Sequence, residues 1–119
     1  MTGLTTHILD LTHGQPASNV TIELYFQEEN STEWTPLKTT VTNDDGRLDS
    51  PFVSEKELKT GCYELVFHIG SYFRSKNIDL SDPPFLDMIP VRFNIVDTTV
   101  HYHVPLLVSP WGYQVYKGS

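Results

Sequence analysis

The sequence has a single cysteine, Cys62, among its 119 residues, so it can form no internal disulfide and no cysteine-rich zinc site. Basic residues are also scarce, since eight Lys and Arg stand against fifteen Asp and Glu, for a net charge of −7. This balance excludes the electrostatic footprint of a nucleic-acid binder. No hydrophobic run is long enough to span a bilayer, and the first residues lack the pattern of a secretory signal. These absences favour a soluble protein of a reducing compartment, with the cytoplasm as the default.

The length of the chain limits what it can build. With 119 residues it can enclose one substantial hydrophobic core but not two, so we expect a single domain over residues 1–119. Hydrophobic residues make up 39% of the chain and charged residues 19%, which are ordinary values for a globular protein. No linker, internal repeat or low-complexity segment divides the sequence.

Apolar and polar residues alternate with a period of two along much of the chain, and turn-forming residues interrupt this pattern every eight to twelve residues. Such alternation indicates β-strands with one buried face. We expect strands over residues 4–11, 20–26, 34–41, 62–69, 90–96, 99–108 and 112–117, with a further short strand that begins at Arg47. Residues 13–16 are expected to form a loop and residues 70–77 a short helix. Seven or eight short strands of this kind predict an all-β, two-sheet sandwich.

The segment HYH carries two histidines, His101 and His103, that share one face of a predicted strand because residues i and i+2 point the same way. His7 has an equivalent position on the first strand, and Arg47 follows an Asn-Asp-Asp-Gly turn signal. A sandwich can place the first strand beside the last two, which would bring three histidines and Arg47 to one surface. Such imidazoles can exchange protons near neutral pH, or hold zinc as a three-histidine site.

The other notable side chains are expected to be structural. His13 in a loop and His68 near a strand end are interpreted as structural or solvent-facing residues. Cys62 is expected to be a small buried residue without an activating neighbour. Trp34 and Trp111 are interpreted as packing residues, with Trp111 at an interface. The sequence has no phosphate-binding glycine loop, no serine nucleophile elbow and no carboxylate pair at a useful spacing.

Four segments of the chain together resemble the transthyretin-like proteins. They are LTTHILDLTHGQPA at residues 4–17, TNDDGRL at residues 42–48, CYELVFHIGSYF at residues 62–73 and HYHVPLLVSPWGYQVYKGS at residues 101–119. Their order and spacing cover essentially the whole chain, and the motifs TTHxLD, DGR and HYHVP are similar to those of the 5-hydroxyisourate-hydrolysing branch. The resemblance implies a two-sheet sandwich with one short helix. It also implies a homotetramer, a dimer of dimers whose central channel holds the sites.

The resemblance implies roles for particular residues. The catalytic residues would be His7, Arg47, His103 and Ser119. The substrate-binding residues would be Tyr116, Lys117, Gly118 and His101. The family motif has arginine at the position of Lys117, and lysine keeps the positive charge but lacks the planar fork that makes bidentate contacts.

The reaction that the resemblance implies is hydrolysis of 5-hydroxyisourate to 2-oxo-4-hydroxy-4-carboxy-5-ureidoimidazoline, the step after urate oxidation in purine catabolism. One of His7 and His103 would activate a water, Arg47 would stabilise the oxyanion, and the hydroxyl or carboxylate of Ser119 would position substrate or water. This scheme needs no metal and no other cofactor. Two alternatives stay open: a transthyretin-like binding protein for a small aromatic ligand, and a zinc-binding histidine cluster. Hormone-carrying transthyretins lack these histidines, which disfavours the first.

Overall fold

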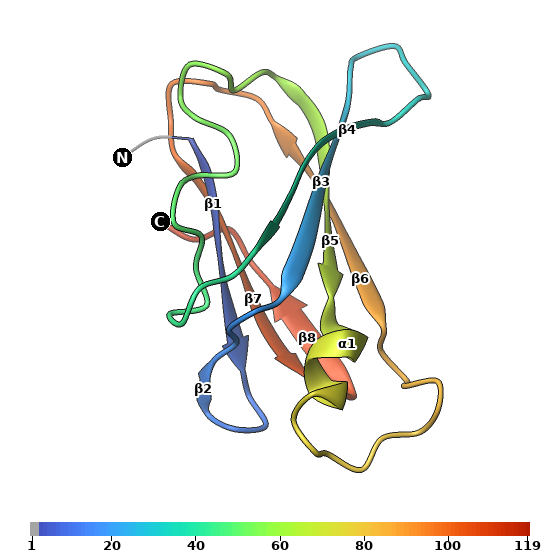
Figure 1. Cartoon of the computed structure of the whole chain (residues 1–119). Coiled ribbons are helices and arrows are strands. Elements are labelled where there is room, and N and C mark those ends of the chain that lie inside the picture. The colour runs from blue at the N-terminus through green and yellow to red at the C-terminus, as the bar shows by residue number, and fades with distance from the viewer. Residues whose placement is uncertain (1–2) are drawn as a thin grey trace.

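The computed structural model describes residues 3–119, which form two four-stranded β-sheets packed face to face (Figure 1). The strand order is β2-β1-β7-β8 in one sheet and β4-β3-β5-β6 in the other. The elements are β1 (Leu4–Asp10), β2 (Gln15–Pro16), β3 (Thr21–Gln27), β4 (Thr35–Val41), β5 (Gly61–His68), α1 (Ile69–Arg74), β6 (Met88–Ile95), β7 (Tyr102–Ser109) and β8 (Gly112–Val115). The predicted two-sheet β-sandwich with a short helix is confirmed over the described residues.

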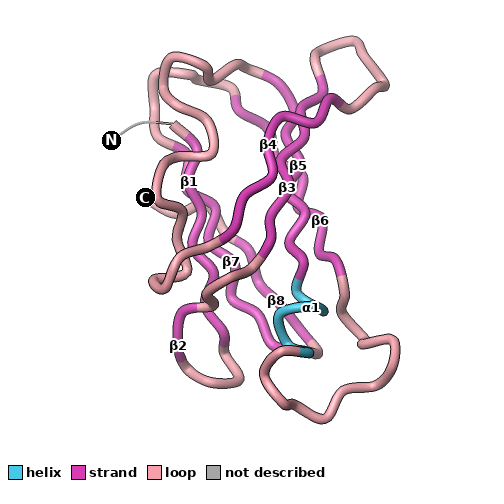
Figure 2. The backbone as a smooth tube through the Cα atoms, in the orientation of Figure 1, coloured by secondary structure: helices cyan, strands magenta, loops and turns pink. Residues whose placement is uncertain are grey.

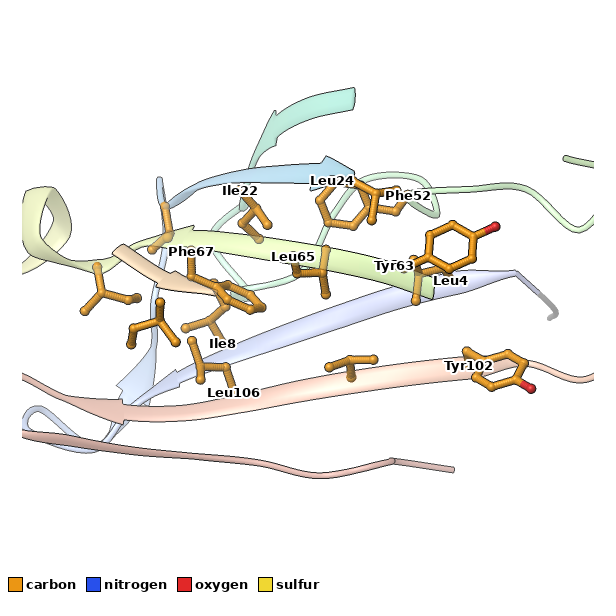
Figure 3. Packing of buried hydrophobic residues seen from close by; sticks show 14 of the residues in the cluster. Leu4, Ile8, Ile22, Leu24, Phe52, Tyr63, Leu65, Phe67, Tyr102 and Leu106 are labelled. Carbon is orange, nitrogen blue, oxygen red and sulfur yellow. The ribbon is translucent and has the colours of Figure 1, made fainter. Parts of the chain in front are cut away.

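The core fills the space between the two sheets with apolar side chains from alternate strand positions. Figure 3 shows Ile8 and Leu106 of the first sheet facing Leu65 and Phe67 of the second, and all four are fully buried. Burying each such side chain stabilises the fold by roughly 1.5–3 kcal/mol. Because the apolar residues occupy the inward positions of each strand, the residues between them lie on the outer faces of the sheets.

The pairing of β1 with β7 decides which outward residues become neighbours. These two strands run parallel, and Thr5 lies opposite His103 while His7 lies opposite Pro105. Along β1, Thr5 and His7 are partly exposed and alternate with buried residues. The predicted sharing of one face by the outward residues of the first and last strands is therefore confirmed.

A long connection between β4 and β5 lies along the edge of β1 that β7 does not occupy (Figures 1 and 2). The Ile8 N–H donates to the Gly46 carbonyl at 2.9 Å, and the Leu4 N–H donates to the Val53 carbonyl at 3.0 Å. Gly46 has a φ of +72°, and a Cβ at this position would lie 2.5 Å from the Ile8 carbonyl oxygen. The connection thus covers the part of the β1 edge that β2 does not reach, and it holds Arg47 beside β1.

A buried carboxylate joins the far end of β1 to the helix. Asp10 is 1% exposed and accepts hydrogen bonds from the Tyr72 hydroxyl at 2.7 Å, from His13 Nδ1 at 2.6 Å and from the Thr12 N–H at 2.9 Å. Burial acts to raise the pKa of Asp10, but the hydrogen bonds from Tyr72 and His13 outweigh it and lower that pKa. The predicted structural role of His13 fits this arrangement.

Two of the expected strand positions and one expected loop are wrong. Arg47 begins no strand but forms one isolated bridge with His7, because the chain bends at residues 49–50 before Pro51. Within the expected loop at 13–16, Gln15–Pro16 forms β2 against β1. The strand expected from residue 99 begins at Tyr102, because the Asp97 carboxylate accepts two hydrogen bonds from Thr99 and holds a turn there.

Several packing expectations also change. Trp111 is 61% exposed at the tip of the β7–β8 hairpin, so it is not buried within this chain. Its expected position at an interface stays a prediction. Cys62 is only partly buried, because it lies near the start of β5. Trp34 is partly buried and lies against Arg92, with the guanidinium 5.0 Å from the ring centre. His68 hydrogen-bonds the Glu23 carboxylate, which agrees with its predicted structural role.

Candidate active site

Two imidazoles meet at one hydroxyl group on the outer face of the β2-β1-β7-β8 sheet. The rings of His101 and His103 are nearly parallel, with an interplanar angle of 16° and a centroid separation of 6.1 Å. Thr5 Oγ1 lies 2.8 Å from His103 Nδ1 and 3.1 Å from His101 Nε2. Thr5 was not expected as a site residue. Its only signal in the sequence is that it shares a face with His7, and the parallel register that places it opposite His103 is a tertiary property.

The two histidines differ in the nitrogen that each leaves free. His103 uses Nδ1 toward Thr5, and its Nε2 makes no hydrogen bond within residues 3–119 and is not buried. His101 uses Nε2 toward Thr5, while its Nδ1 is buried without a hydrogen-bond partner among those residues. His103 can therefore offer a ring nitrogen to a bound molecule, whereas His101 cannot.

The positive charge of Arg47 acts on the histidines of the site. Arg47 bridges His7 through the backbone, and its guanidinium charge acts on the two imidazoles of His7 and His103. Burial lowers the pKa of both histidines below the ordinary value of 6.5, and the charge of Arg47 lowers it further. A hydrogen bond to the backbone of Asp45 and the carboxylate charge of Asp45 act in the opposite sense on His7, but they are smaller. Near neutral pH, both rings are thus held in the form that can accept a proton.

A cavity of about 260 Å³ opens beside this group. Its lining includes Thr5, Arg47, His101, His103 and Ser119. This volume lies slightly below the usual range of ligand sites, which is roughly 300–1,000 Å³. A small polar heterocycle therefore fits the cavity better than a large hormone does.

The final residues reach the site through a glycine. The Gly118 N–H donates to the His103 carbonyl at 2.8 Å, and a Cβ on Gly118 would lie 2.7 Å from His103 Cδ2. Only glycine allows the backbone to pass this close to the imidazole ring, and the next residue, Ser119, reaches the cavity. Tyr116 and Lys117 line a second cavity, which His103 also lines, and Lys117 Nζ lies 5.3 Å from the centre of the Tyr102 ring.

The structure gathers six of the eight predicted site residues around the outer face of β1 and β7: His7, Arg47, His101, His103, Gly118 and Ser119. Tyr116 and Lys117 line the second cavity, which shares only His103 with the first. No group of three or more His, Cys, Asp or Glu side chains suited to a metal ion occurs within residues 3–119. Because Thr5 occupies one nitrogen on each of His101 and His103, the geometry does not favour a zinc cluster. Over the same residues, no helix has the length and apolar character needed to cross a membrane.

A two-sheet sandwich of this topology, with a histidine and arginine cluster on the outer face of one sheet, has the transthyretin-like fold. Residues 4–118 match the model of the HIUase/Transthyretin family. The chain belongs to that family.

Individual relatives agree with this assignment. The chain is 50% identical over 116 residues to 5-hydroxyisourate hydrolase 2 of Rhizobium meliloti (strain 1021), a match that covers 98% of this chain and 95% of the relative. The structure of Klebsiella pneumoniae 5-hydroxyisourate hydrolase superposes with a TM-score of 0.78 at 33% identity, and each chain is covered completely. The crystal structure of (S)-allantoin synthase gives a TM-score of 0.91 at 44% identity, with 98% of this chain covered. This chain spans only 43% of that protein.

Proposed function

We propose that this protein is a hydrolase that converts 5-hydroxyisourate to 2-oxo-4-hydroxy-4-carboxy-5-ureidoimidazoline in urate catabolism. The observation that carries this proposal is the position of Arg47 beside two imidazoles of lowered pKa, His7 and His103, on the outer face of the sheet. The similarity to relatives named 5-hydroxyisourate hydrolase supports the choice of substrate.

His103 is the general base in this proposal. Its free Nε2 removes a proton from water as the water oxygen attacks a ring carbonyl of the substrate, which forms a tetrahedral oxyanion. When the oxyanion collapses, the C–N bond breaks, and the departing nitrogen takes the proton back from His103. The lowered pKa of His103 suits this role because the ring is neutral before the reaction begins.

Arg47 and the remaining residues support the charge that develops. The permanent positive charge of Arg47 stabilises the oxyanion, an effect worth roughly 10²- to 10³-fold in rate for a well-placed donor. His7 contacts the substrate beside Arg47 and can supply the second proton-exchanging group. Ser119 positions the substrate or the water, and His101 and Gly118 hold the position of His103.

The assembly is part of the proposal. We expect a homotetramer, a dimer of dimers, and the exposed apolar side chains near the free sheet edges support it. Strands β6 and β8 end their sheets. Large apolar side chains that are 47–61% exposed lie on or beside them: Met88, Trp111, Tyr113 and Tyr116. Tyr116 and Lys117 would contribute to substrate binding through this assembly. Sedimentation equilibrium checks it, because a tetramer has four times the chain mass, while a monomer contradicts it. The cytoplasmic location stays a prediction.

An ultraviolet assay tests the reaction directly. Urate oxidase generates 5-hydroxyisourate in the cuvette, and its decay is followed with and without the protein. We expect faster decay with the wild-type protein and about a 10³-fold loss of kcat in His103→Asn, because the general base is removed. Circular dichroism and sedimentation of the variant should match the wild type. Decay at the spontaneous rate in the presence of folded wild-type protein would refute the hydrolase assignment.

A further inference from the structure

The proposed mechanism assigns no role to Thr5, although its hydroxyl contacts both His101 and His103. Thr5 lies on β1, whereas His103 lies on β7 and His101 directly precedes β7. Thr5 is partly buried, and no third hydrogen-bond partner of its side chain occurs within residues 3–119. Its hydroxyl therefore serves the two imidazoles.

Counting hydrogens shows what one hydroxyl can do between two rings. Thr5 has one hydrogen to donate, so two bare ring nitrogens facing it cannot both be satisfied. When both rings are neutral, the Thr5 hydroxyl is fully used if one facing ring nitrogen carries a proton and the other is bare. The protonated nitrogen then donates to Oγ1, and the hydroxyl donates to the bare nitrogen. The tautomers of His101 and His103 are thus coupled through Thr5.

The proposed role of His103 selects the arrangement in which its Nδ1 carries the proton. His103 Nε2 is the accessible nitrogen, whereas Nδ1 faces Thr5. A neutral ring that accepts a proton at Nε2 has its own proton on Nδ1, which then donates to Thr5 Oγ1. The Thr5 hydroxyl then donates to His101 Nε2, which leaves the proton of His101 on the buried Nδ1.

That buried and unpartnered His101 Nδ1 is costly. Most buried polar groups in native proteins have a hydrogen-bond partner, and one without a partner destabilises the fold. Buried polar atoms without partners are typical of places where function, and not stability, determines how the side chains are arranged. His101 is thus placed for its contact with Thr5.

We infer that Thr5 is a positioning residue that fixes His103 in the tautomer with a bare Nε2 toward the cavity, and that His101 supports it by accepting the Thr5 hydrogen. The inference rests on the proposed hydrolase function. Its logic is that of a catalytic triad, in which a third group holds the tautomer and orientation of a histidine base. Here the third group is a neutral hydroxyl, so it orients His103 without the strong pKa-raising effect of a carboxylate.

The proton transfer in this scheme is balanced. His103 Nε2 takes a proton from water and the ring becomes imidazolium, while Nδ1–H continues to donate to Thr5 Oγ1. The titratable groups around His103 are Arg47 and Asp49 from the β4–β5 connection, His7 on β1, His101 before β7 and Lys117 after β8. The Thr5 oxygen is a hydrogen-bond acceptor for the imidazolium when that charge forms.

Nitrogen-15 NMR of the histidine side chains tests the tautomer without any substrate. At about pH 8, we expect His103 with its proton on Nδ1 and a bare Nε2, and His101 also with its proton on Nδ1. Thr5→Val should leave His103 as a mixture of tautomers. A wild-type His103 with its proton on Nε2 would overturn the inference.

Kinetics test the consequence. Thr5→Val preserves shape and β-branching, and we expect kcat to fall about 10- to 100-fold, a part of what a general base contributes, with KM within about twofold. The acidic limb of the kcat profile should move to lower pH, because the imidazolium loses an acceptor. Thr5→Ser, which keeps the hydroxyl, should recover activity to within about threefold. Thr21→Val, a matched threonine on β3 in the opposite sheet, should leave kcat and the pH profile unchanged.

A double variant separates positioning from simple loss of packing. His101→Phe should lower kcat in the same direction as Thr5→Val, and the two together should be no worse than the more severe single change, because they remove one shared unit. Independent, multiplicative losses, or an unchanged pH profile in Thr5→Val, would contradict the role of Thr5. If wild-type protein does not accelerate decay, the proposed function fails. If wild-type activity is lost in His103→Asn but kept in Thr5→Val, only this inference fails.

Discussion

The two ends of β1 hold histidines in opposite environments. At the end near α1, His13 Nδ1 lies 2.6 Å from the buried carboxylate of Asp10. At the beginning of the strand, His103 contacts a hydroxyl and lies in the field of Arg47. At the site end, burial and the charge of Arg47 lower the pKa of His103. The same side chain is therefore a structural tie at one end and a candidate base at the other.

His68 also has a carboxylate partner, in the second sheet. It hydrogen-bonds the Glu23 carboxylate, and it lies far from the cavity that contains His103. Of the five histidines in the chain, the two in direct contact with a carboxylate lie outside the candidate site. The partner of each imidazole, more than its position on a strand, thus distinguishes structural from catalytic candidates.

The largest expected effect comes from removing the cation at the site end. Arg47→Gln should lower kcat/KM about 10²- to 10³-fold, because the oxyanion loses its charged donor. It should also raise the pKa of His103 toward the ordinary value, since the charge of Arg47 lowers it. Steady-state kinetics over a pH series measure both effects. Wild-type kcat/KM in this variant would show that Arg47 is not what makes the environment of His103 functionally different from that of His13.

A smaller effect, on stability and not on catalysis, is expected at the other end. Asp10→Asn should lower the free energy of unfolding by about 3 kcal/mol, because a buried carboxylate that accepts several hydrogen bonds is replaced by a group with its own N–H donors. Urea unfolding measures the change, while kcat per folded molecule should stay within about twofold.

Asp97→Asn is the matched control for that experiment. Asp97 also accepts hydrogen bonds from a nearby residue, Thr99, but it lies on the surface, so its loss should change stability much less. Equal losses of unfolding free energy in the two variants would mean that the burial of Asp10 does not explain its contribution to stability. A large loss of kcat in folded Asp10→Asn would mean that the two ends of β1 are not independent.

The smallest expected effect is that activity and folding stability are lost at different pH values. The pKa of His103 is lowered below 6.5, so kcat/KM should fall only as pH drops through a value beneath 6.5. The pKa of Asp10 is also lowered, from 3.8, so its contribution to stability is complete above 3.8 and is lost as pH falls through the lowered value. The protein should therefore become inactive before it loses this stability. Coincident loss of activity and circular dichroism would contradict the separation.

Much of this architecture could be predicted from the sequence, because a period of two reports directly which face of a strand is buried. That pattern placed His101 and His103 on one face and His7 on the corresponding face of the first strand. It could not give the parallel register of β1 and β7, which depends on the packing of the whole sandwich, and so Thr5 was missed. The Asn-Asp-Asp-Gly signal located the turn before Arg47, but the single bridge to His7 depends on the tertiary contact at Gly46.

Gly46 has no side chain, yet we expect a functional screen to score it beside the candidate catalytic residues. Its carbonyl accepts the Ile8 N–H, and its positive φ and close contact leave no room for a Cβ. Any other residue would push the connection away from β1 and carry Arg47 out of register with His7. We therefore expect substitutions at Gly46 to lower activity through the position of Arg47, the next residue along the chain.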